Sequence, residues 1–207
     1  MIVQTLAVGE LKTNCYLLIN DKGNAIVIDP ADEAEKIIDK IKEQNLSVKA
    51  ILLTHGHFDH IMATNQVKKE FNCPVIIGEP DEEMLNDDEK NAAVLMGLHV
   101  EKVTADKKVN DGDVLDFDTF RIKVLSTQGH TKGSVCYIVD DIIFSGDTLF
   151  YESVGRCDLY GGNAMKLMQS LKKIAQLEGE FDVFPGHGYC TKLSYEKEHN
   201  RWLKSVI

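Results

Sequence analysis

Four side chains that commonly bind metal ions lie within the motif HGHFDH, residues 55–60. The motif directly follows the apolar segment AILLT, which we expect to be a buried strand ending there, with a helix beginning after it. Side chains alternate along an extended segment, so His55 and His57 point the same way and can reach one ion. Asp59 and His60 lie beyond the turn and can face a second ion. The cluster predicts a metal site, because imidazoles and a carboxylate gathered near a core are costly without a metal.

Three more metal-capable side chains follow later in the chain, each at the end of an expected strand and beside glycine. They are His130 in QGHTKGS, Asp147 in FSGDTLF and His187 in FPGHG. Polar side chains at strand ends project from a rigid sheet edge, and glycine lets the backbone pass close to an ion. Taken alone, either histidine could equally be a hydrogen-bonded structural residue. His99 and His199 lie outside any motif, and we expect them to be ordinary surface or packing residues.

The segments before the first motif must carry it to the edge of a sheet. Short strands are expected over residues 2–8, 13–20 and 24–29, because apolar and β-branched residues are concentrated there between turn signals. Residues 33–45 then place their apolar side chains at helical spacing. This order predicts a strand, a helix and a further strand that ends at the histidine motif.

The second half of the chain repeats this plan. Strands are expected over residues 114–117, 120–126, 134–139 and 141–146, followed by a helix from about residue 163 and a strand over 182–185. In each half a strand ends in aspartate (Asp29, Asp147), a helix follows, and a further strand delivers histidine (His55, His187). The pattern predicts two similar β-sheet halves with helices outside.

Composition restricts the class of protein and its partners. With 207 residues, 43% of them hydrophobic, the chain can form a single domain over residues 1–207 or at most two tightly packed halves. The net charge of −10, without a basic stripe, argues against nucleic acid as a partner, and no apolar run is long enough for a membrane span. Five widely spaced cysteines and no export leader predict reduced thiols and a cytoplasmic location. The most polar stretch, residues 80–91, is expected to be a solvated surface helix or a lid.

The order of these motifs, HxHxDH followed by His, Asp and His, resembles that of the metallo-β-lactamase superfamily. The resemblance extends from AIVIDP through SGDTLF and FPGHG to the stretch Glu196–Leu203. It implies an α/β, four-layer αββα fold, with two packed β-sheets and outer helices. Within the superfamily, SVGRCDLYGG is similar to a segment of small bacterial glyoxalase II-like thioester hydrolases.

The resemblance also implies a role for each metal-capable residue. The first ion would be held by His55, His57 and His130, the second by Asp59, His60 and His187, and Asp147 would bridge them. Nitrogen and carboxylate ligands without a thiolate suit two divalent ions, with Zn the first choice and Fe or Mn also compatible. Secreted lactam-degrading members commonly have a cysteine where Asp147 stands, which argues against antibiotic hydrolysis here.

The implied reaction is cleavage of a small-molecule thioester, such as S-lactoylglutathione, or of a related ester, by a hydroxide shared between the ions. Asp59 would orient the hydroxide, and Asp147 would share in catalysis by holding both ions. Asp29 is a candidate hydrogen-bond partner for a ligand histidine. Lys132, Arg156 and Lys192 are candidates to bind a substrate carboxylate, the alternative being a surface role for both lysines and a structural one for Arg156.

Three other functions fit the same residues. A lactonase would use the same ions and hydroxide and differ only in its pocket. A persulfide dioxygenase would hold one Fe(II) on two histidines and one aspartate, so metal identity and stoichiometry separate it from a hydrolase. A metal-binding module without catalysis is disfavoured by the full ligand set.

Overall fold

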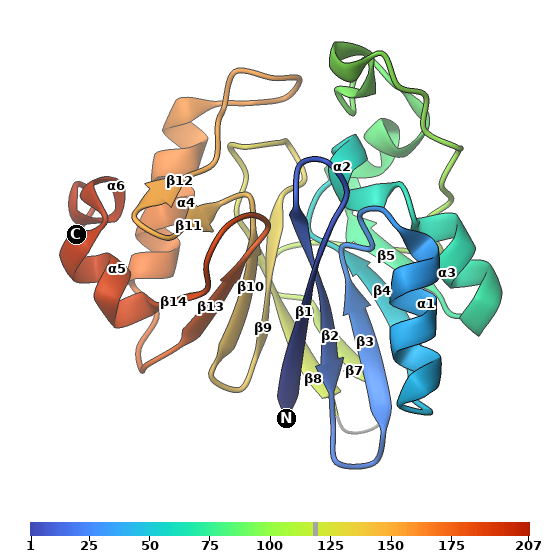
Figure 1. Ribbon diagram of the computed structural model, residues 1–207. Helices are drawn as coiled ribbons and strands as arrows, with labels where there is room; N and C mark the ends of the chain where they lie inside the picture. The colour runs from blue at the N-terminus through green and yellow to red at the C-terminus, as the bar shows by residue number, and fades with distance from the viewer. Residues whose placement is uncertain (118–119) are drawn as a thin grey trace. The chain divides into compact units, whose positions relative to one another are not determined.

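A computed structural model describes residues 1–117 and 120–207, which form two compact units, Met1–Val109 and Asn110–Ile207. Each unit contains a six-stranded mixed β-sheet with accompanying helices (Figure 1). The strands expected at residues 2–8, 13–20, 24–29 and 50–54, and those expected in the second half, are confirmed with end shifts of a few residues.

The sheet of the first unit has the order β1-β2-β3-β4-β5-β6. Its strands are β1 (Ile2–Val8), β2 (Thr13–Ile19), β3 (Asn24–Ile28), β4 (Ser47–Leu53), β5 (Val75–Gly78) and β6 (Lys107–Val109). β1 to β3 are antiparallel neighbours, whereas β3 to β6 run parallel. All residues of β2 and β5 are buried, so these strands show no alternation of buried and exposed positions.

The helices of the first unit are α1 (Ala34–Glu43), α2 (Phe58–Ile61) and α3 (Thr64–Phe71), with 3-10 helices η1 (Glu79–Asn86) and η2 (Ala93–Met96). The helix expected over residues 33–45 is confirmed as α1, which buries Ile37 and Ile41 and packs against α3. The expectation of a solvated surface helix at residues 80–91 is wrong, since η1 buries Asp81, Met84 and Leu85. The alternative, a lid, stays a prediction. Asp81 and Met84 lie against Gly56 in the loop that follows β4, and the Asp81 carboxylate accepts a hydrogen bond from the Gly56 amide.

The sheet of the second unit has the order β14-β13-β10-β9-β8-β7. Its strands are β7 (Val114–Phe117), β8 (Phe120–Ser126), β9 (Val135–Val139), β10 (Ile142–Gly146), β13 (Asp182–Pro185) and β14 (Thr191–Lys192), and β11 (Leu149–Phe150) pairs with β12 (Ser153–Val154). The helices are α4 (Ala164–Ala175), α5 (Leu193–His199) and α6 (Arg201–Lys204). No helix in the described part of the chain is long and apolar enough to cross a membrane.

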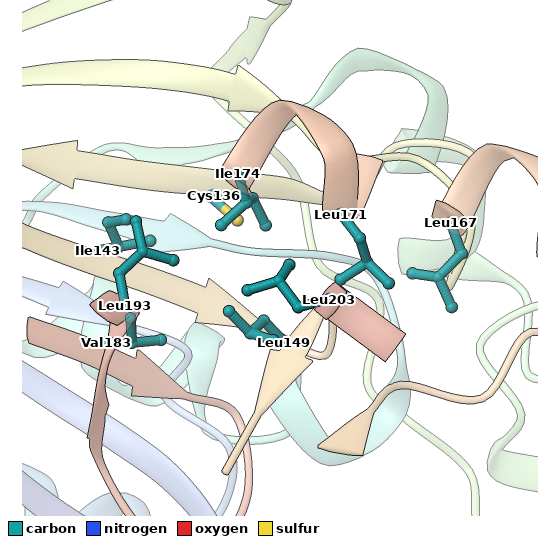
Figure 2. Packing of buried hydrophobic residues seen from close by; sticks show 9 residues of the cluster. All are labelled: Cys136, Ile143, Leu149, Leu167, Leu171, Ile174, Val183, Leu193 and Leu203. Carbon is teal, nitrogen blue, oxygen red and sulfur yellow. The ribbon is translucent and has the colours of Figure 1, made fainter. Parts of the chain in front are cut away.

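One core cluster joins the helices of the second unit to its sheet. Leu167, Leu171 and Ile174 project from α4 toward apolar side chains of β10 and α6, such as Ile143 and Leu203, as Figure 2 shows. All five are at most 3% exposed. The apolar face predicted for the helix after residue 163 is therefore the face that packs against the core of the second unit.

Each unit contains a parallel strand–helix–strand crossover of the kind that the repeated sequence plan predicts. In the first unit α1 connects β3 to its parallel neighbour β4, and in the second α4 lies between β10 and its parallel neighbour β13. Parallel neighbours end at the same edge of a sheet. Within each unit this places an aspartate and a histidine motif together: Asp29 beside residues 54–57, and Asp147 near His187.

The five cysteines form no disulfide in the described residues. Cys15, Cys73 and Cys136 are buried, whereas Cys190 is exposed. Burial raises the pKa of the Cys73 thiol to about 11 and that of Cys136 to about 12, so both remain protonated at neutral pH.

A buried polar network fastens the end of the chain to the β11–β12 hairpin. The Asn200 side chain accepts hydrogen bonds from the Trp202 and Leu203 amides of α6 and donates to the Ser153 carbonyl and to Glu196. Glu196 in turn accepts from the Glu152 amide and from the Thr191 hydroxyl. Asn200 and Glu196 are both 0% exposed, so every unmade bond would carry a full desolvation cost.

Replacing Asn200 with alanine is expected to lower the free energy of unfolding by about 2–3 kcal/mol, because the change removes a helix cap and leaves buried partners unsatisfied. Asn163→Ala is the matched control: Asn163 also caps a helix, through the Lys166 amide, but is only partly buried. It should cost about 1 kcal/mol. Urea unfolding of both variants measures the difference, and equal losses would show that the buried network adds nothing to the cap.

Candidate metal centre

The loop after β4 gathers three histidines within the first unit. His55, His57 and His60 are 1%, 4% and 0% exposed. The ring centroid of His55 lies 4.8 Å from that of His57 and 4.1 Å from that of His60. Three buried imidazoles at this separation cannot all be protonated, because like charges would repel in a poorly solvated site. Metal binding would use the neutral form of these imidazoles.

Asp29 orients two of these histidines from the end of β3. Its carboxylate accepts hydrogen bonds from the Thr54 amide at 2.7 Å, the Thr54 hydroxyl at 2.6 Å and Nδ1 of His60 at 2.9 Å. Because the Thr54 hydroxyl proton is directed to Asp29, its oxygen accepts from Nδ1 of His55 at 3.1 Å. Both Nδ1 atoms thus carry the proton, and the ligand lone pair of each ring lies on Nε2.

Asp29, His55 and His60 also offer three ligand atoms within 4.8 Å of one another. The Asp29 carboxylate is already used by three short hydrogen bonds, so we assign it a positioning role and not a ligand role. Its backbone has φ 48°, a left-handed conformation that aspartate and asparagine tolerate better than most residues.

Replacing Asp29 with asparagine is expected to weaken metal binding about 10- to 100-fold, because an amide cannot accept all three hydrogen bonds and the histidine tautomers are no longer fixed. Asparagine keeps the size and tolerates the left-handed backbone, so the fold should remain. Competition with a chromophoric chelator measures the affinity, and Asp21→Asn, at a surface turn, serves as the control. Unchanged affinity in Asp29→Asn would disprove the positioning role.

Asp59 lies on α2, one residue before His60. Its Oδ2 atom accepts a hydrogen bond from the Thr13 hydroxyl at 3.2 Å and lies 3.7 Å from Nε2 of His60. The second distance is too long for a hydrogen bond. The carboxylate and the imidazole are therefore close neighbours that are not hydrogen-bonded to each other through these two atoms.

Gly56 allows the histidine loop to lie directly on η1. A Cβ atom at this position would come within 2.7 Å of the Met84 Cβ and 3.1 Å of the Asp81 carbonyl oxygen. Only glycine therefore fits between His55 and His57. The buried Asp81 carboxylate then holds the loop through the Gly56 amide at 3.1 Å.

The second unit brings together its own three candidate ligands. Oδ2 of Asp147 lies 3.6 Å from Nε2 of His130 and 3.6 Å from Nε2 of His187. Nδ1 of His130 donates to the Arg156 carbonyl at 2.7 Å, which leaves the lone pair of His130 on Nε2, toward Asp147. One carboxylate oxygen thus lies at equal distances from two imidazole nitrogens, beyond hydrogen-bond range.

The donor atoms fit metal ions. Nε2 of His57, Nε2 of His60 and Oδ1 of Asp147 are buried and make no hydrogen bond within the described residues, although each side chain has other contacts. Burying such atoms is costly, and a cation would offset the cost. Imidazole nitrogens and carboxylate oxygens without thiolates are compatible with Zn, Fe or Mn.

The three cationic side chains proposed for substrate binding have partners nearby. Arg156 forms a two-point ion pair with Asp158, with atoms 2.7 and 2.9 Å apart, and this pair holds the pKa of Asp158 at about 2. Lys192 pairs with Asp182 at 2.8 Å, and Lys132 lies over the Tyr160 ring. All three are exposed, so a substrate carboxylate would have to compete with these contacts.

The two histidines outside the motifs lie on the surface, as expected. His99 pairs with Asp88 and has 85% of its side chain exposed, and His199 stacks on Tyr195. Sequence reasoning missed Thr13, Thr54 and Asp81, which hold the metal-capable side chains in place. Isolated threonines and an aspartate within a polar stretch carry no spacing signal, so only the structure identifies them.

Comparison with known proteins extends these observations. A family model described as the metallo-beta-lactamase superfamily matches residues 8–187. The chain belongs to the metallo-β-lactamase superfamily. This membership confirms the predicted α/β fold, with two mixed β-sheets and flanking helices, and it implies that two metal ions are bound by histidine and aspartate clusters.

Three relatives show how varied the superfamily is around this chain. A hydroxyacylglutathione hydrolase GloC from Haemophilus influenzae is 33% identical over 210 residues, covering 99% of each chain. The B3 metallo-β-lactamase BLEG-1 is 37% identical in sequence, and its crystal structure matches with a TM-score of 0.94. The match covers 98% of this chain and 99% of the BLEG-1 chain. TTHA1623, solved in a di-iron-bound form, is 34% identical with a TM-score of 0.86, covering 96% and 99%.

Proposed function

We propose that this metallo-β-lactamase superfamily protein is a thioester hydrolase that binds two metal ions, and that the preferred metal is Zn. His55, His57 and His130 would hold one ion, Asp59, His60 and His187 the other, and Asp147 both. The proposal requires residues 1–207 to act as one domain, since each unit contributes part of the ligand set. The observation that carries it is the Asp147 oxygen at 3.6 Å from the Nε2 atoms of both His130 and His187, since a carboxylate shared in this way suits a bridging ligand.

When bound, the two ions supply Lewis acidity that lowers the pKa of water toward about 7 and stabilises the oxyanion formed from the thioester carbonyl. The chain's own residues fix the geometry. Asp29 and Thr54 set the histidine tautomers, while the Thr13 hydroxyl holds the Asp59 carboxylate, which orients the attacking water and accepts its proton. The leaving thiolate needs no general acid, because thiols have a pKa of about 8.5.

The glyoxalase II-like assignment is supported by the SVGRCDLYGG segment and by the GloC relative. Because BLEG-1 is a B3 metallo-β-lactamase, a lactam must be tested as an alternative substrate. Asp147 argues against a lactam, since secreted lactam-degrading members commonly have a cysteine at this position. The experiment that tests the proposal is hydrolysis of S-lactoylglutathione by protein loaded with two Zn ions, followed by loss of thioester absorbance.

A chelator should abolish this turnover and added Zn should restore it. A chromogenic cephalosporin, assayed with the same protein, should be cleaved far more slowly. Faster cleavage of the cephalosporin would contradict the thioester proposal. With two Zn bound, inactivity on several thioesters together with activity on lactones would favour the lactonase.

Iron is the second candidate metal, because TTHA1623 was solved in a di-iron form. Metal analysis of protein purified without added metal distinguishes the candidates. Two ions per chain fit a hydrolase with either metal. One iron per chain, with oxygen uptake on a persulfide substrate, would instead favour the dioxygenase.

A further inference from the structure

A cavity in the first unit opens beside the candidate ligand Asp59. It has a volume of about 300 Å³, at the lower end of the range for small-molecule sites. Its walls come from the turn between β1 and β2, from α2 and from the segment around η2. Figure 1 shows this turn and α2 at the same end of the first unit. Since Asp59 is a wall residue, a molecule in this cavity lies against the candidate metal centre.

The cavity is lined mainly by apolar side chains. Phe58 and Met62 belong to α2 and the residue after it, Leu11 comes from the β1–β2 turn, and Met96 and Leu98 come from the η2 segment. Leu11, Met96 and Leu98 are 46%, 48% and 41% exposed, an unusual degree for clustered large apolar residues. Such clusters commonly mark ligand sites, and methionine adapts to ligands of varied shape.

The charged residues of the cavity are all acidic: Glu10, Asp32 and Asp59. Among the described residues that line it, none is basic. Asp32 is held against the β1–β2 turn, since its Cβ and Oδ2 lie 3.0 Å from where a side chain on Gly9 would begin. Glu10 and Asp32, the two carboxylates that are not assigned to the metal centre, would repel an anionic group entering this cavity, whereas an uncharged apolar group would gain contacts.

We propose that this cavity holds the acyl part of the thioester, and that the preferred acyl group is an uncharged apolar chain. The proposal rests on the thioester function proposed above. The thiol part is a poorer occupant, because the common thiol carriers of cells bear carboxylates or phosphates and the cavity offers them no cation. The small, hydroxylated lactoyl group would leave most of the apolar wall unused.

The first test compares acyl groups on one small neutral thiol, N-acetylcysteamine. For the Zn-loaded protein, kcat/KM for the hexanoyl thioester should exceed that for the acetyl and lactoyl thioesters by about tenfold or more. The 5-carboxypentanoyl thioester, of similar length but anionic, should be at least about tenfold poorer than hexanoyl. Equal values for hexanoyl and acetyl, or for hexanoyl and its anionic counterpart, would overturn the inference while leaving the hydrolase function intact.

A pair of variants locates the preference. Leu98→Asp should lower the hexanoyl-to-acetyl ratio about tenfold, because it removes apolar wall and adds a fourth carboxylate. Leu95→Asp is the matched control: Leu95 is in η2, 65% exposed and not part of the cavity wall. It should leave the ratio unchanged. Equal effects of the two substitutions would overturn the assignment of the acyl group to this cavity.

A binding measurement separates this inference from the hydrolase function. The hexanoyl analogue with CH2 in place of sulfur cannot be hydrolysed, and its binding should shift the labelled methyl NMR signals of Met62 and Met96 but not those of Met165 and Met168. Shifts without any thioesterase activity would disprove the hydrolase function and retain an apolar ligand site. If the analogue shifted neither signal, the inference would be overturned. It would also be overturned if the Met96 signal moved only on dilution of the protein, because this would indicate that a second copy of the chain covers the cavity.

Discussion

Replacing Asp147 with alanine is expected to reduce kcat/KM for thioester hydrolysis about 10³-fold or more and to lower bound metal below two ions per chain. The reason is geometric: one oxygen of this carboxylate lies 3.6 Å from the Nε2 atoms of both His130 and His187. Without it, the carboxylate that the two imidazoles share is lost. Metal analysis and steady-state kinetics on the same sample measure both effects.

Asp182→Ala is the matched control for this substitution. Asp182 belongs to the same unit and sheet and pairs with Lys192 at 2.8 Å, but the pair is largely exposed. Exposed ion pairs contribute little to stability, so metal content and the free energy of unfolding should remain near wild type. Asp147→Ala protein that still held two ions at full activity would refute the bridging role.

The second large effect is expected from Gly155→Ala. A Cβ atom on Gly155 would lie 1.8 Å from the Asp147 carbonyl oxygen and 3.2 Å from Nδ1 of His130. Backbone must therefore move, and we expect a loss of more than about 3 kcal/mol in the free energy of unfolding. Because the displaced atoms belong to Asp147 and His130, metal binding should weaken as well.

Urea unfolding and metal titration of Gly155→Ala measure these two losses. Gly112→Ala is the control, since Gly112 has φ +85° and no atom within 4 Å of its added Cβ. Gly112→Ala should cost about 1–2 kcal/mol through backbone strain alone, a strain that Gly155 does not share because its φ is not left-handed. If Gly155→Ala were no more destabilising than Gly112→Ala, the close packing of residue 155 on Asp147 would not be required for the fold.

Much of the fold could be predicted because its signals are periodic. The helical face of Ile37 and Ile41, and that of Leu167 and Leu171, repeat at helical spacing, and both faces pack as expected. β5 and α3 were not predicted. β5 is four buried residues without alternation, and α3 buries only Thr64 and Val67, so neither has a distinctive period.

The candidate ligands could be selected from sequence because histidine and aspartate clusters with fixed spacing are rare. The residues that hold these ligands in place could not be predicted from sequence. Thr13, Thr54 and Asp81 act through hydrogen bonds to residues 25 or more positions away. The buried position of Asp81 was also missed, because its neighbours in the sequence are acidic and suggested a solvated segment. Long-range hydrogen bonds leave no local pattern.

The unequal burial of the cysteines has a practical consequence for spectroscopy. Thiolates react with maleimides and thiols hardly do, so Cys73 and Cys136, with pKa values raised to about 11 and 12, should be labelled slowly. Cys190 is exposed and follows His187 by three residues. A fluorophore attached there, with the partly exposed Cys157 replaced by serine, would report on the FPGHG loop in real time.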